Sequence, residues 1–164
     1  MKTKQNANTA SEMKIKENYM KMQLPALSVN ESFARTTVAA FAASLNPTLD
    51  EINDIKTAVS EAVTNCVVHA YDGEGVIGIE CNLLQNGIRI SITDSGRGIK
   101  DIENAMQPFV TTKPDEERSG MGFTVMQSFM DSVSVTSKED GGTTVTLQKF
   151  FAKEESKVNR KITG

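Results

Sequence analysis

Apolar residues recur at every second position in several short stretches of the chain. Met20, Met22 and Leu24 alternate with polar neighbours, and two longer alternating runs are separated only by the turn sequence Gln-Asn-Gly at residues 85–87. Such alternation is typical of strands with one buried face, and a short turn between two runs is typical of a hairpin. A second hairpin turns at Asp-Gly-Gly, residues 140–142. The pattern predicts five strands, in or around residues 20–24, 77–83, 88–92, 133–135 and 145–147.

Between these strands the apolar spacing changes to that of amphipathic helices. The first helix is expected to begin at Ser28 or Asn30, as its cap, and to end before Pro47. The second opens with Thr48 and Glu51, which are spaced as a capping box. The apolar stripes of the second helix and of a short third helix comprise Ile52, Ile55, Val59, Ala62 and Cys66, and Phe123, Met126 and Met130. These elements predict an α+β fold, a two-layer sandwich with helices on one face of a mostly antiparallel mixed sheet.

Composition bounds the domain organisation and the compartment. The 164 residues suit one domain, expected over residues 20–150, and the polar residues 1–19 and 151–164 are expected to be disordered tails. The net charge of −3, with 18 basic residues scattered among 21 acidic ones, argues against direct nucleic-acid binding. No apolar run is as long as a membrane span, and Cys66 and Cys81 lack metal-like spacing. A cytoplasmic protein with reduced cysteines is therefore predicted.

A polar stripe borders the buried face of the second predicted helix. Glu61, Asn65 and His69 are each four residues apart, so their side chains share one side of the helix. A carboxylate and a carboxamide one turn apart can serve together as a base and a metal ligand. A merely solvated helix face is the other interpretation of this stripe.

Three glycine motifs follow the stripe in order. Asp-Ser-Gly-Arg-Gly at residues 94–98 comes directly after a predicted strand, where glycines let the backbone approach a ligand and Asp94 can accept a hydrogen bond from an exocyclic amine. Ser-Gly-Met-Gly at residues 119–122 precedes a helix whose first N–H groups can bind phosphate. Gly142 and Thr143 lie in the last hairpin. Each motif alone is also consistent with an ordinary turn.

The order and placement of these four elements resemble the Bergerat ATP-binding fold, the family of gyrase, Hsp90, histidine kinases and MutL, over residues 20–149. Four segments are also similar to the anti-sigma F factors of spore-forming bacteria, namely residues 30–35, 60–65, 108–113 and 118–123. That family consists of serine kinases that bind a sigma factor and phosphorylate its antagonist. The resemblance implies an inhibited sporulation sigma factor and a phosphorylated anti-anti-sigma protein as partners, and a homodimer.

The resemblance further implies a site for ATP or ADP with Mg²⁺. Asn65 would hold Mg²⁺, and Glu61 would accept the proton of the attacking serine hydroxyl. Asp94 would bind the adenine amino group, with support from Thr143 on the neighbouring strand. Backbone contacts beside the nucleotide and around its phosphates are implied at four glycines, Gly96, Gly98, Gly120 and Gly122.

A lid between the glycine motifs is also expected, over residues 99–119. Thr112 or Lys113 would approach the phosphates from this segment. Because the lid has few apolar anchors, its local stability should be low.

Two functions other than that of an anti-sigma kinase are disfavoured by the sequence. The only histidine, His69, lies inside the nucleotide helix, which disfavours a histidine kinase, and the absence of a basic surface disfavours a DNA-linked ATPase of the gyrase or MutL type. Two alternatives stay open: a general-stress, sigma-B type anti-sigma kinase, and a non-catalytic switch that binds ATP and a partner.

Overall fold

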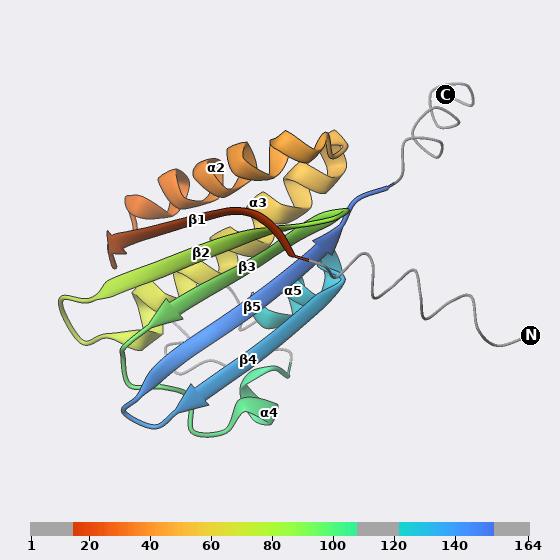
Figure 1. Cartoon of the computed structure of the whole chain (residues 1–164). Coiled ribbons are helices and arrows are strands. Elements are labelled where there is room, and N and C mark those ends of the chain that lie inside the picture. The colour runs from red at the N-terminus through yellow and green to blue at the C-terminus, as the bar shows by residue number, and fades with distance from the viewer. Residues whose placement is uncertain (1–14, 108–121, 153–164) are drawn as a thin grey trace, which may run out of the picture.

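The computed structural model describes residues 15–107 and 122–152 (Figure 1). The described elements in chain order are β1 (Ile15–Pro25), α2 (Asn30–Ala42), the 3-10 turn η1 (Ala43–Leu45), α3 (Leu49–Asn65), the π-helical turn η2 (Cys66–Ala70), β2 (Val76–Leu84), β3 (Gly87–Asp94), α4 (Ile102–Ala105), α5 (Gly122–Phe129), β4 (Ser132–Lys138) and β5 (Gly142–Phe150). None of the described helices is long and apolar enough to cross a membrane.

The five strands form one sheet in the order β1-β2-β3-β5-β4, and both predicted hairpins, β2–β3 and β4–β5, are confirmed. Each of the four strand pairings is antiparallel, so the expectation of a mixed sheet is wrong for the described strands. The reason is that α2 and α3 form a helical hairpin, which returns the chain to the end of β1. There the Ala26 N–H donates to the Gly75 carbonyl at 2.8 Å, and β2 starts back along β1.

The domain extends beyond the predicted limits at both ends. Strand β1 begins at Ile15 rather than near residue 20, with Ile15 opposite Leu84 and an irregularity before Tyr19. At the other end Phe151 is buried in the core, and its N–H donates to the Asn86 carbonyl at 2.9 Å. Residues 15–19, 151 and 152 of the predicted tails therefore belong to the described fold, and residues 1–14 and 153–164 lie outside the described residues.

The core lies between the helices and one face of the sheet (Figure 1). Along β3 the isoleucines at positions 88, 90 and 92 are fully buried, whereas Arg89, Ser91 and Thr93 point to the other face. The predicted stripe of α3 is confirmed from Ile55 to Cys66, and Ile52 packs at its margin. The helix-free face is rich in hydroxyl groups instead, as in the Thr93–Thr144 pair at 3.0 Å. The predicted two-layer α+β sandwich is thus confirmed.

The helix ends show one correct and one wrong prediction. The capping box of α3 is present, because the Glu51 N–H donates to Thr48 Oγ1 at 3.2 Å and the Thr48 N–H donates to the Glu51 carboxylate at 2.7 Å. Helix α2, however, has Val29 at its N-cap and no side-chain cap. Asn30 donates to the Pro25 carbonyl at 2.9 Å instead, which fixes the turn from β1 into the helix.

Candidate functional site

The C-terminal end of α3 is joined to the segment that follows β3. Helix α3 ends at Asn65 and continues as the π-helical turn η2, a rare geometry that is found often at functional sites. The last carbonyl of this turn, on Ala70, accepts the Arg97 N–H at 2.9 Å. A side chain at Gly96 would overlap the same carbonyl. The helix with the polar stripe and the loop of residues 94–98 are thereby held together.

Asp94 is the buried polar group at the centre of this junction. It is the last residue of β3 and only 7% exposed. One carboxylate oxygen, Oδ1, accepts the Gly96 N–H at 3.0 Å, and the other, Oδ2, lies 3.6 Å from the Cys66 thiol. Burial is the main cause that raises the pKa of the Cys66 thiol, and the nearby charge of Asp94 raises it further. The carboxylate therefore faces the helical side of the sheet.

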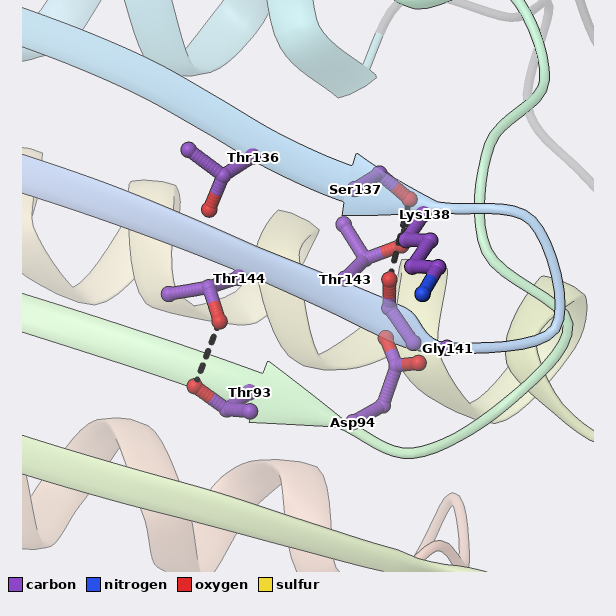
Figure 2. A pocket seen from close by; sticks show the side chains of 9 residues that line it. Thr93, Asp94, Thr136, Ser137, Lys138, Gly141, Thr143 and Thr144 are labelled. Atoms are coloured by element: carbon purple, nitrogen blue, oxygen red, sulfur yellow. Dashed lines mark hydrogen bonds between the residues drawn. The ribbon is translucent and has the colours of Figure 1, made fainter.

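The tip of the β4–β5 hairpin supports the end of β3 (Figure 2). Thr143 lies on the strand next to Asp94, as predicted, and directly opposite it. Its hydroxyl, however, forms a hydrogen bond with the Ser137 hydroxyl at 2.8 Å. Ser137 also donates to the Gly142 carbonyl at 3.0 Å and accepts the Ile99 N–H at 2.7 Å. Sequence reasoning missed Ser137. The available signal was a polar residue at an inward position of β4, in step with two valines.

Two predicted glycines have a structural reason that is separate from any ligand. Gly98 has φ of 74°, and a side chain there would overlap the Lys138 carbonyl of β4. Gly142 has φ of 83°, and a side chain there would overlap the Asp94 carbonyl. Both residues allow main chain to pack against main chain at the end of the sheet. The contact to a nucleotide that is predicted for Gly98 remains a prediction.

The polar stripe of α3 faces the start of α5. A Cβ atom added to Gly122, the first residue of α5, would lie 3.2 Å from Asn65 Oδ1 and 3.5 Å from Glu61 Oε2. A carboxylate, a carboxamide and the N-terminus of a helix therefore meet at one place, the arrangement that phosphate and its counter-ion require. The three side chains of the stripe are each half-buried, namely Glu61, Asn65 and His69. This burial argues against the interpretation of the stripe as a merely solvated helix face.

Part of the predicted set lies outside the described residues, namely Thr112, Lys113 and Gly120. Of the segment expected as a lid, residues 102–105 form α4, which Asp101 caps by accepting the Asn104 N–H at 3.0 Å.

A shallow hollow of about 270 Å³ opens at the same end of the sheet (Figure 2). Its lining includes Asp94, Ser137 and Thr143 as well as Thr93, Thr136 and Thr144. Thr93 points away from the helices, because neighbouring residues of a strand face opposite sides, and Asp94 faces them. The hollow therefore spans the end of the sheet, from Asp94 to the threonines of the helix-free face.

Comparison with known proteins identifies the class of this fold and site. Residues 24–149 match the family model of the histidine kinase-like ATPase domain. Among curated relatives, the anti-sigma F factor of Caldanaerobacter subterraneus subsp. tengcongensis is 56% identical over 137 residues, which cover 83% of this chain and 96% of the relative. That of Anoxybacillus flavithermus is 52% identical over 144 residues, covering 87% and 99%. The chain belongs to the anti-sigma F factor family of histidine kinase-like ATPase domains, which confirms the resemblance drawn from its motifs.

Solved structures support the fold alone. The RsbU and RsbW domains of a Mycobacterium tuberculosis protein share 21% identity with a TM-score of 0.62, covering 83% of this chain and 33% of that one. The catalytic domain of the histidine kinase ThkA shares 16% identity with a TM-score of 0.52, covering 84% and 99%.

Proposed function

We propose that the protein is a cytoplasmic anti-sigma factor and ATP-dependent serine kinase. It inhibits a sporulation sigma factor, phosphorylates a serine of the anti-anti-sigma antagonist, and acts as a homodimer. The sigma-factor role is supported by relatives named anti-sigma F factor that match across nearly their whole length. The observation that carries the kinase role is the meeting of Glu61, Asn65 and the start of α5 at Gly122.

Adenine recognition falls to Asp94 in this proposal. An ionised carboxylate only accepts hydrogen bonds and has about four lone-pair positions, whereas Asp94 accepts one bond on each oxygen from the described residues. The 6-amino group of adenine is a donor and suits the remaining capacity. Gly142 and Thr143 hold the backbone of Asp94 from the neighbouring strand, so the carboxylate is positioned before the base arrives.

The phosphate end suits Mg²⁺ with a single protein ligand. Mg²⁺ usually keeps several waters and phosphate oxygens and takes only one or two protein ligands. The Asn65 carboxamide lies beside the start of α5, where N–H groups can bind phosphate, and thus fits this requirement. When bound, Mg²⁺ would neutralise phosphate charge. The described residues hold no cluster of three or more His, Cys, Asp or Glu side chains that could bind a metal without a nucleotide.

The proposed base for phosphate transfer, Glu61, lies one helical turn from Asn65. A bond would form between the serine oxygen and the terminal phosphorus, and the bond from that phosphorus to the bridging oxygen would break, so that ADP leaves. The serine proton would pass to the Glu61 carboxylate, which lies on the same side of α3 as Asn65. Positioning and charge neutralisation supply most of the rate of such transfers, and the base supplies the rest.

Replacement of the base tests this assignment. Glu61→Gln keeps the size of the side chain but removes its basicity, so phosphorylation of the anti-anti-sigma protein should slow by about 10²–10⁴-fold while ATP affinity stays near that of the parent. Asp50→Asn, an exposed carboxylate at the other end of α3, is the control and should leave the rate unchanged. An unchanged rate in Glu61→Gln, or a fall in affinity that matches the fall in rate, would remove Glu61 from the chemistry.

A further inference from the structure

A cysteine lies next to the carboxylate that is assigned to adenine, and the proposed function gives it no role. Cys66 is the first residue of the π-helical turn η2 and only 4% exposed. Its thiol lies 3.6 Å from Asp94 Oδ2, within the range of a sulfur hydrogen bond. A carboxylate cannot donate when ionised, so the thiol must be the donor. The contact joins the helix with the polar stripe directly to the group that reads the base.

We infer that Cys66 is a positioning residue that sets the orientation of the Asp94 carboxylate and thereby the preference for a 6-aminopurine. This inference rests on the proposed adenine-binding role of Asp94. The two donors to Asp94 come from different elements, since Gly96 follows β3 and Cys66 begins η2. With one donor on each oxygen, rotation of the carboxylate about its terminal bond is opposed from both sides.

The choice of a thiol has a chemical consequence. An S–H group is a weaker donor than a hydroxyl or an amide N–H. It can hold Oδ2 in place without using much of the acceptor strength of that oxygen, which stays available to the amino group of a base. The alternative is a purely structural role, in which Cys66 acts only as a small apolar residue, as is common for a buried cysteine.

Two variants with small side chains at position 66 distinguish the role of a hydrogen-bond donor from that of a small apolar residue. Cys66→Ala and Cys66→Ser both remove the sulfur, but only serine provides a donor. The probes are ATP and purine riboside triphosphate, which lacks the 6-amino group. We expect the preference for ATP to fall about threefold in Cys66→Ala and to return to within about twofold of the parent in Cys66→Ser, since a thiol is a weak donor and acts on the nucleotide only through Asp94. Affinity for the analogue without the amino group should not change.

Cys81→Ala is the matched control, because Cys81 is also fully buried but lies within β2. It should keep the preference of the parent. Equal preference for ATP in the Cys66→Ala, Cys66→Ser and parent proteins would overturn the positioning role, as would equal losses for both nucleotides. A parent that binds ATP no better than the analogue would instead refute the proposed role of Asp94 in reading adenine.

A spectroscopic measurement avoids any change at Cys66. In the Cys81→Ala protein, Cys66 carries the only S–H group, so its Raman stretching band can be assigned. We expect the frequency of a hydrogen-bonded thiol, with a shift toward the free-thiol frequency in the Cys81→Ala, Asp94→Asn double variant. A free-thiol frequency in both proteins would contradict the contact on which the inference rests.

Discussion

The two ends of the proposed nucleotide site are built differently. At the base end, Asp94 is fixed by main-chain contacts, in which Gly96, Gly98 and Gly142 each pack against a carbonyl of another segment. At the phosphate end, half-buried side chains of a single helix, Glu61 and Asn65, face the first residue of α5. The contacts of the base end therefore also hold the fold together, whereas the side chains of the phosphate end project from a helix that is already in place. Substitutions should affect stability at the first and affinity or chemistry at the second.

The largest effect is expected from a side chain at the base end. Gly142→Ala places a Cβ atom against the Asp94 carbonyl at a φ of 83°, so it combines steric overlap with backbone strain. We expect a loss of about 2–4 kcal/mol in the free energy of unfolding, measured by urea denaturation. Gly73→Ala is the control, because no atom lies within 4 Å of its Cβ position and its φ is not positive. Equal stability of the two variants would show that the base end is not built into the fold.

At the phosphate end the fold should survive while ligand binding changes. Asn65→Ala removes the proposed Mg²⁺ ligand, and we expect the Mg²⁺-dependent part of ATP affinity to fall about 10–100-fold, since hydrogen bonds and contacts to charged groups are the stronger ones. Titration calorimetry with and without Mg²⁺ measures this difference. Asn53→Ala, on an exposed position of the same helix, should bind like the parent. The metal assignment fails if Asn65→Ala keeps full Mg²⁺-dependent affinity.

A smaller effect is expected where the base end is supported by side chains. Ser137→Ala leaves the Ile99 N–H and the Thr143 hydroxyl without their partner. The substitution also removes the hydrogen bond to the Gly142 carbonyl, and the expected cost of losing all three is about 1–2 kcal/mol of unfolding free energy. Ser134→Ala, exposed on the other face of the same strand, should cost close to nothing. Thermal unfolding of both variants distinguishes them, and equal midpoints would mean that Ser137 does not hold the hairpin tip.

Local patterns in the sequence predicted the layers of the fold, because period and capping are local properties. The Thr48–Glu51 box and the alternation around residues 85–87 are contained within a few neighbours, and both were correct. The start of β1 at Ile15 was missed, since that strand depends on pairing with Leu84, far along the chain. The cap of α2 was wrong because Asn30 bonds to Pro25 in the preceding strand rather than to its own helix.

The candidate site was predictable in its members but not in its contacts. Four motifs in order indicated Glu61, Asn65, Asp94 and the glycines, because each residue type suits a nucleotide. The sequence could not indicate that Cys66 lies against Asp94, since 28 positions separate them and a buried cysteine is usually a core residue. Ser137 was hidden for a similar reason, as its partners come from two other segments, the loop after β3 and the start of β5.

One measurement tests the kinase proposal most directly. The protein, γ-labelled ATP, Mg²⁺ and a candidate anti-anti-sigma protein are mixed, and ADP and phosphoserine are counted over the same period. We expect one phosphoserine for each ADP released, on a single serine of the anti-anti-sigma protein. Tight ATP binding with neither product would contradict the kinase assignment and leave a nucleotide-dependent switch. ADP formed without phosphoserine would contradict it equally, because the terminal phosphate would then have passed to water.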